Sequence, residues 1–76
     1  MEEPSEELDL RGLKCPLPAL LARRRLAAAP AGTVLLVVTD DPMAPIDVPH
    51  MCRTEGFEHV STEHRPAEAW MVLRRP

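Results

Sequence analysis

The most informative part of the sequence runs from residue 8 to residue 18 and reads Leu8-Asp9-Leu10-Arg11-Gly12-Leu13-Lys14-Cys15-Pro16-Leu17-Pro18. Its first four residues alternate between apolar and polar, which is the pattern of a half-buried strand. Gly12 then permits a turn. Prolines are tolerated in the first turn of a helix, where backbone N–H groups lack intrahelical partners, but not in its interior. The stretch therefore predicts a strand, a turn and a helix that begins at or just after Cys15.

The next segments predict a long helix and a central strand. Residues 16–29 are rich in Leu, Ala and Arg, all strong helix formers, and Pro30 and Gly32 end the helix. Residues 33–39 are the best strand in the sequence, because β-branched side chains pack well on a pleated surface. Their continuous apolarity indicates a central strand that is covered on both faces or meets a partner with one of them.

The last third of the chain predicts a shorter helix and two strands. We expect the helix over residues 48–55, with Asp47 as its N-cap and Gly56 in the left-handed conformation that closes it. Strands follow over residues 57–62 and 67–74, and the segment between them is the connection.

The resulting order of elements is βαβαββ. The simplest way to bury these apolar faces is an α+β fold: a two-layer α/β sandwich in which two helices cover one face of a four-stranded mixed sheet. A chain of 76 residues is one domain, which we place at residues 8–76, after a flexible acidic leader at residues 1–7.

Composition narrows the classes of function. The formal net charge of −3 argues against direct binding of nucleic acid. No apolar run approaches the ~20 residues that span a bilayer, and the acidic start does not resemble a signal peptide, so we expect a cytoplasmic protein without membrane insertion. In that compartment Cys15 and Cys52 are expected to be free thiols. The histidines and cysteines lack the spacing of zinc ligands, and we expect no metal and no cofactor.

Cys15 is the candidate catalytic residue. The sequence places its sulfur between a predicted strand and the N-terminus of a predicted helix, beside the positive charge of Lys14. Such surroundings favour an anion and predict a lowered pKa and a reactive thiolate. Pro16 and Pro18 stiffen this turn and remove two N–H donors, and with Gly12 and Lys14 they are the residues expected to shape the site. Without this context, a lone cysteine is more often structural.

The first helix carries two different stripes. One consists of small residues that would allow close packing on the sheet: Ala19, Ala22, Leu26 and Ala29. Leu17 and Leu21 lie on the other side and are expected to stay partly exposed beside Cys15. Together with the basic residues Arg23 and Arg24 they form the predicted partner-docking surface, with Lys14 at its edge. The alternative is that these are ordinary solvated side chains.

The remaining polar and sulfur-containing residues favour structural roles. Cys52 lies on the predicted apolar face of the second helix and is expected to be a buried, inert thiol, with a second sulfur-handling role as the alternative. Asp40 and Asp41 precede Pro42 and are expected to serve a turn rather than acid–base chemistry.

The stretch from Leu8 to Pro18 resembles the signature of the TusA/SirA-like sulfurtransferase family, whose hallmark is a Cys-Pro-x-Pro motif, here residues 15–18. A second block, from Asp40 through Cys52 to Gly56, is similar to the second-helix region of that family. Two positions depart from the family pattern. Phe57 stands where members often have His, and Met51 stands where an aromatic residue is common; both positions bear on the choice of partner.

The resemblance implies a βαβαββ fold and a persulfide carried on Cys15. Members of the family relay sulfur from a cysteine desulfurase or a rhodanese-type donor to an acceptor protein, in tRNA 2-thiolation, molybdenum-enzyme maturation or sulfur oxidation. The chain would then be a sulfurtransferase that acts as a carrier rather than as a stand-alone enzyme. Two alternatives remain open: a non-catalytic protein-binding or regulatory module of the same fold, and a thiol redox protein that cycles Cys15 through mixed disulfides.

Overall fold

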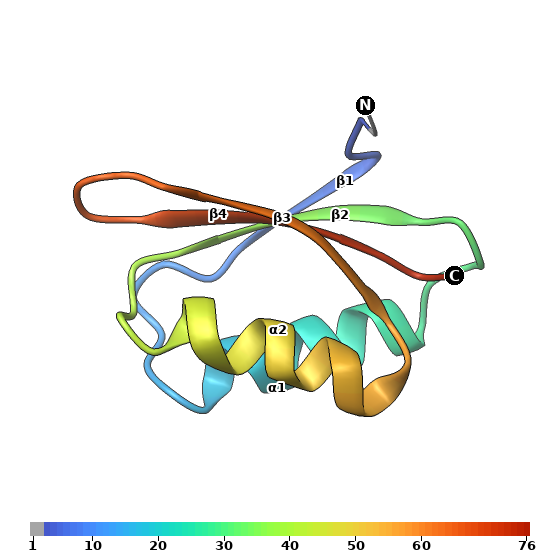
Figure 1. Ribbon diagram of the computed structural model, residues 1–76, viewed down its shortest axis with the longest axis horizontal. Helices are drawn as coiled ribbons and strands as arrows, with labels where there is room; N and C mark the ends of the chain where they lie inside the picture. Colours follow the sequence, from blue (N-terminus) through green and yellow to red (C-terminus); the bar gives the residue numbers. More distant parts are fainter. Residues whose placement is uncertain (1–2) are drawn as a thin grey trace.

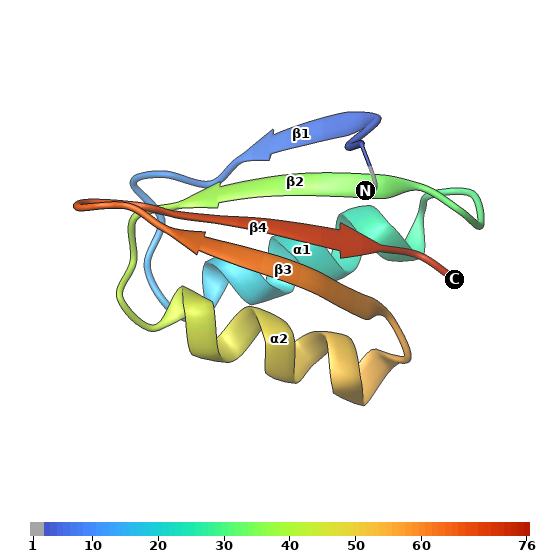
Figure 2. The same cartoon turned by 45° about the horizontal axis from the view of Figure 1, so that its top comes forward.

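The apolar segment after the first helix forms the middle of the sheet in the computed structural model, which describes residues 3–76. This strand, β2 (Val34–Thr39), pairs in parallel with β1 (Glu6–Asp9) and antiparallel with β4 (Ala69–Arg74). Strand β3 (Glu58–His64) adds to the far edge of β4, which gives the order β1-β2-β4-β3 seen in Figure 2. The predicted βαβαββ order and the mixed four-stranded sheet are confirmed.

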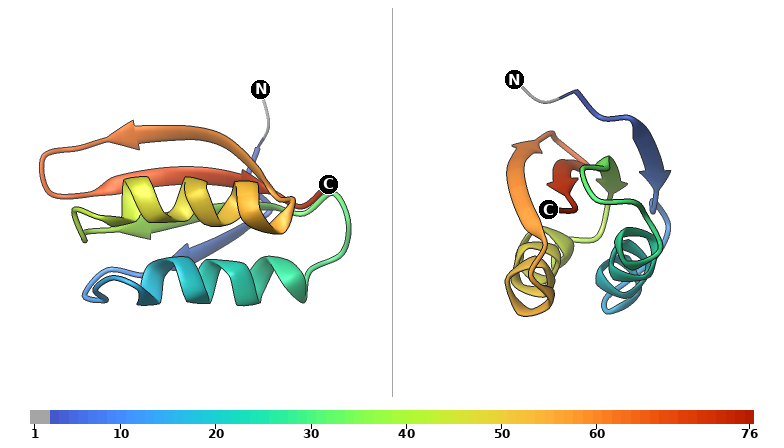
Figure 3. Two further views of the ribbon diagram at one scale, coloured as in Figure 1. Left: turned by 60° about the horizontal axis from the view of Figure 1, so that its bottom comes forward. Right: turned by 90° about the vertical axis from the view of Figure 1, so that its right-hand side faces the viewer.

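Two helices form the second layer. Helix α1 (Leu17–Ala27) and helix α2 (Ala44–Glu55) lie side by side beneath one face of the sheet, as Figure 1 and the end-on view in Figure 3 show. The two-layer sandwich with both helices on one face is therefore confirmed. Among residues 3–76, neither helix is long and apolar enough to cross a membrane.

The hydrophobic core lies between the two layers. Alternate residues of the two central strands point toward the helices, because side chains alternate between the faces of a sheet. The largest fully buried side chains come from both layers and include Leu26, Leu35, Val37, Val48, Met71 and Leu73. Helix α1 packs on them through the predicted small-residue stripe, in which Ala22 and Leu26 are fully buried. The helix ends at Ala27, two residues earlier than expected, so the nearly buried Ala29 lies just beyond it. The exposed side of α1 carries Leu17 and Leu20.

Helix α2 begins at Ala44, four residues earlier than expected, and the N-cap position is Met43. The prediction of Asp47 as the N-cap was therefore wrong. Pro45 lies in the first turn, where its missing N–H is harmless, so that Asp47 falls inside the helix. Gly56 closes α2 with φ +78°, as predicted, because this left-handed conformation is unfavourable for a residue with a Cβ.

The other element boundaries shift by a few residues. Strand β1 begins at Glu6, inside the segment expected to be a flexible leader, and Glu6 forms an ion pair with Arg25 of α1. The last residues of the leader thus belong to the sheet, while residues 1–2 lie outside the described part of the chain. The connection between β3 and β4 covers residues 65–68 rather than 63–66, because β3 continues to His64 and its pairing partner Ala69 is the first residue of β4.

Candidate functional site

Cys15 lies exposed in the loop between β1 and α1. Two contacts hold this loop against the end of β2. The Leu10 N–H donates to the Val38 carbonyl at 2.8 Å, and the Gly12 N–H donates to Asp40 Oδ1 at 2.9 Å. Gly12 has φ +85°, which explains the glycine at this turn. The Cys15–Pro16 peptide bond is cis, and α1 begins two residues after the sulfur-bearing residue.

The direct hydrogen-bond partner of the Cys15 thiol is a carboxylate of helix α2. Cys15 Sγ donates a hydrogen bond to Asp47 Oδ2 at 2.8 Å, across a separation of 32 residues in sequence. Sequence reasoning did not include Asp47 in the site, because a carboxylate near a helix start was interpreted as a cap. No local signal relates residue 47 to residue 15, so the pair could be found only from the packing of α2 beside α1.

Asp47 reverses the expected ionisation of Cys15. The hydrogen bond to Asp47, then burial, then the negative charges of Asp47 and Asp41 raise the pKa of the Cys15 thiol. The prediction of a lowered pKa was therefore wrong. The helix N-terminus supplies little compensation, because Pro16 and Pro18 have no N–H and the Leu17 N–H donates to the Lys14 carbonyl.

The Cys15 sulfur opens into a groove of about 370 Å³ between the two helices. The apolar part of its lining comes from Pro16, Ala19, Leu20 and Met51. The polar part comes from Arg23 of α1 and from residues of α2 that include Asp47, His50, Thr54 and Glu55. A segment of a partner protein that enters this groove would meet apolar surface, charges of both signs and the sulfur atom.

The residues predicted to dock a partner lie together in a hollow beside the groove, which is lined by Leu17, Leu21, Arg23 and Arg24. Of these four, Arg23 also lines the groove with Cys15, and Leu21 packs partly against the core. Leu20 lines both hollows and is 43% exposed, although the predicted docking set did not contain it.

Three cations of the predicted site are available to a partner. Within residues 3–76, Lys14, Arg23 and Arg24 form no ion pair, whereas Arg25 is engaged by Glu6. Salt bridges elsewhere occupy Arg11, whose guanidinium contacts both Asp9 and Glu68.

The second cysteine sits in a different environment. Cys52 of α2 has no exposed surface, and burial raises the pKa of its thiol to about 11. Such a thiol is inert toward partners in the folded protein, in agreement with the expected packing role.

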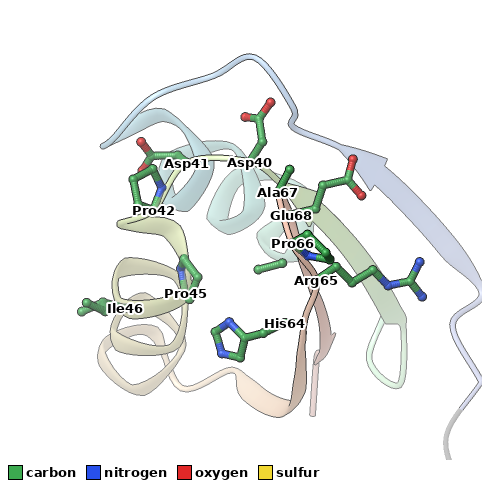
Figure 4. Close-up of a pocket in the computed structure, with 11 residues that line it drawn as sticks. Asp40, Asp41, Pro42, Pro45, Ile46, His64, Arg65, Pro66, Ala67 and Glu68 are labelled. Carbon is green, nitrogen blue, oxygen red and sulfur yellow. The ribbon is translucent and has the colours of Figure 1, made fainter.

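Another hollow lies at the tip of the β3–β4 hairpin, where it faces the start of α2. Figure 4 shows the His64 ring directed toward Pro45, while Arg65 extends away from the hollow. Its two aspartates hold turns, as predicted: Asp40 accepts from Gly12, and Asp41 Oδ2 accepts from the Met43 N–H at 3.1 Å. No cysteine lines this hollow, whereas Cys15 lines the groove between the two helices.

Comparison with known proteins agrees with this arrangement. Residues 6–75 match the family model of the sulfurtransferase TusA. A protein of Neisseria meningitidis serogroup A, described as a candidate sulfur carrier protein, is 50% identical over 52 residues, which are 68% of this chain and 70% of the relative. The crystal structure of a SirA-like protein from Desulfitobacterium hafniense has the same fold, with a TM-score of 0.77 and 23% identity over 91% of this chain and 95% of that one. With the family model matching nearly the whole chain, this protein belongs to the TusA sulfurtransferase family.

Proposed function

We propose that this protein is a sulfur carrier that holds sulfur as a persulfide on Cys15. The observation that carries the proposal is the contrast between its two thiols. Cys15 is exposed at a groove between two helices, whereas Cys52 is fully buried. Only the first of these sulfur atoms can meet the reactive sulfur of another protein without unfolding.

The transfer is a thiol exchange on sulfane sulfur. The Cys15 thiolate attacks the outer sulfur of a persulfide on the donor, a new S–S bond forms on Cys15, and the S–S bond of the donor breaks. The donor cysteine leaves as a thiolate and takes up a proton. Passing the sulfur on repeats the exchange, with the cysteine of an acceptor protein as the attacking group.

The residues around Cys15 have separate roles in this proposal. Gly12 supplies the turn, and Pro16 and Pro18 start α1 so that the sulfur stays outside the helix. Lys14 offers an unpaired positive charge next to the sulfur-bearing residue.

Partners dock on the surface of α1. Leu17 and Leu21 supply apolar contact, and Arg23 and Arg24 attract acidic groups. The charge-reversing variants Arg23→Glu and Arg24→Glu should therefore slow sulfur transfer, with a defect that changes with ionic strength. Transfer rates that these two variants leave unaltered would remove the docking role.

The partners that fit are a cysteine desulfurase or a rhodanese-type protein as donor and a thiol-bearing protein as acceptor. We place this relay in the cytoplasm, where thiols remain reduced. The routes consistent with it are tRNA 2-thiolation, molybdenum-enzyme maturation and sulfur oxidation. The protein acts as a link between enzymes, because its reactive atom lies at the surface and exchanges sulfur with other proteins.

Intact-mass spectrometry tests the proposal. The reduced protein is incubated with a cysteine desulfurase, cysteine and pyridoxal phosphate, beside the Cys15→Ser and Cys52→Ser variants. We expect a gain of one sulfur atom that Cys15→Ser abolishes and Cys52→Ser retains. Thiosulfate with a rhodanese serves as the second donor.

The alternatives give different masses. If neither donor adds sulfur to a folded protein whose Cys15 is still alkylated readily, the sulfur-carrier proposal fails and a binding or regulatory module is favoured. If the only product is a mixed disulfide between Cys15 and the donor, the protein is a redox partner rather than a carrier.

A further inference from the structure

The two sides of the groove at Cys15 carry opposite charge. The α1 side presents Arg23, and the α2 side presents Asp47 and Glu55. The two helices run beside each other (Figure 3), and we call the α1 side with Arg23 the basic rim and the α2 side with Asp47 and Glu55 the acidic rim. Although Cys15 precedes α1 in the chain, its sulfur is bound to the acidic rim through the 2.8 Å hydrogen bond to Asp47.

This contact favours the protonated sulfur. A thiol can donate to a carboxylate, but a thiolate at the same distance would place two negative charges in contact and lose the hydrogen bond. Asp41 adds a further negative charge to the surroundings of the sulfur. Arg23, His50 and Glu55 also line the groove, and the surroundings as a whole raise the pKa of the Cys15 thiol.

We propose that Asp47 holds Cys15 as a thiol in the free protein and that a sulfur donor releases it by placing a Lys or Arg side chain against Asp47. The inference rests on the proposed sulfur-carrier function and specifies the chemistry of the partner. Pairing with a cation neutralises the carboxylate, so that Cys15 ionises more readily in the docked complex than in the free protein. The proton that Cys15 gives up is balanced by the proton that the departing donor thiolate takes up, and no further reactant is needed.

The rims also define how the partner is oriented. A complementary surface carries its cation opposite Asp47, next to its reactive sulfur, and an acidic group opposite Arg23. A partner turned the other way would bring like charges together on both rims. Asp47 is thus a positioning residue that selects partners by charge, and it protects an exposed thiol from reacting with unrelated disulfides while the protein is free.

Small thiol reagents of different charge test this inference without any protein donor. The protein is studied as Cys52→Ala, so that Cys15 is the only thiol. Methanethiosulfonates that carry a trimethylammonium or a sulfonate group stand in for partners with and without the proposed cation. We expect the cationic reagent to react faster, and we expect Asp47→Asn to lower the cation-to-anion rate ratio by roughly tenfold at low ionic strength.

A neutral reagent, iodoacetamide, measures the ionisation of Cys15 directly. Each unit by which a thiol pKa falls raises the thiolate fraction about tenfold and lowers the intrinsic nucleophilicity about threefold. Asp47→Asn should therefore accelerate alkylation near pH 7 by about threefold per unit and move the pH–rate profile to lower pH. Glu55→Gln is the matched control, because it removes one carboxylate from the same rim without touching Cys15, and it should leave the profile in place.

The Asp47→Asn variant distinguishes three roles of Asp47: suppressing the ionisation of Cys15, promoting it, or leaving it unaffected. If Asp47→Asn changes neither the charge selectivity nor the pH–rate profile while circular dichroism shows a folded protein, Asp47 has no influence on the sulfur. If Asp47→Asn slows iodoacetamide near pH 7 and moves the pH–rate profile to higher pH, Asp47 promotes ionisation, which is the opposite role. These measurements use no sulfur donor, so a protein that takes up no persulfide in the mass experiment can still show the effect of Asp47, and the two failures are distinguishable.

Discussion

Two leucines of α1 should respond to the same substitution in opposite ways. Leu26 is fully buried against the sheet, whereas Leu20 is 43% exposed and lines the groove at Cys15. We predict that Leu26→Ala destabilises the fold and leaves the chemistry of Cys15 intact. We predict that Leu20→Ala leaves the fold nearly as stable and weakens sulfur transfer between proteins.

The magnitudes follow from burial. Truncating a fully buried leucine to alanine removes about 3–5 kcal/mol, which combines lost transfer free energy with the cavity that remains. A domain of 76 residues has a free energy of unfolding of only about 4–11 kcal/mol, so Leu26→Ala removes a large part of it. Leu20 buries only part of its side chain, and its truncation should remove less than about 1 kcal/mol, partly offset by the higher helix propensity of alanine.

Urea denaturation followed by circular dichroism measures the stability difference. Transfer rates from a persulfide-loaded donor, measured at a temperature where both variants are folded, give the functional difference. A Leu20→Ala variant whose free energy of unfolding fell by more than about 2 kcal/mol would contradict this prediction, because a half-exposed side chain has too little buried surface for that loss. A Leu20→Ala variant with unchanged transfer would show that partners do not use the groove.

Three further outcomes are expected. In the Cys52→Ala protein, the pH–rate profile of alkylation should place the pKa of Cys15 above the ordinary thiol value of about 8.5, and an inflection below pH 7.5 would contradict the contact with Asp47. Gly56→Ala should lower the free energy of unfolding by about 0.5–1.5 kcal/mol in urea denaturation, because a Cβ there meets no atom but the left-handed backbone is unfavourable; a neutral or stabilising effect would contradict this. The Arg11 guanidinium lowers the pKa of Asp9 from 3.8 to about 2, so this carboxylate stabilises the fold above about pH 4 and loses that contribution as the pH falls to about 2. The free energy of unfolding of the Asp9→Asn variant should therefore fall less between about pH 4 and about pH 2 than that of the unmodified protein. An equal loss in both proteins would count against the ion pair.

Much of the fold could be predicted because its signals are local. Within a helix, the two prolines after Cys15 are tolerated only at the start, and α1 begins where they require. The β-branched run of β2 and the left-handed glycine that ends α2 likewise depend on backbone preferences of single residues. These local preferences agree with the global packing, which is why the order of elements was predicted correctly.

The errors arose where one signal had two interpretations. Asp47 was interpreted as the N-cap of the second helix, with Pro49 in the first turn. Pro45 fits a first turn equally well, and the helix starts there, at Ala44. Similarly, a stripe of leucines on α1 could not be divided between core and surface by periodicity. Leu21 packs partly against the core, while Leu20 turns toward the groove, because α2 lies on that side of α1.

The amino-acid sequence was sufficient to assign the family, the order of strands and helices along the chain, and the placement of Cys15 before a helix. The contacts of the Cys15 sulfur, in contrast, follow from the packing of the folded chain. A pKa depends on charges and hydrogen bonds within a few ångströms, whatever their distance along the chain. The packing of α2 beside α1 brings Asp47 to the thiol from 32 residues away, and this contact outweighs the neighbouring Lys14 and the helix N-terminus that the sequence pattern emphasised.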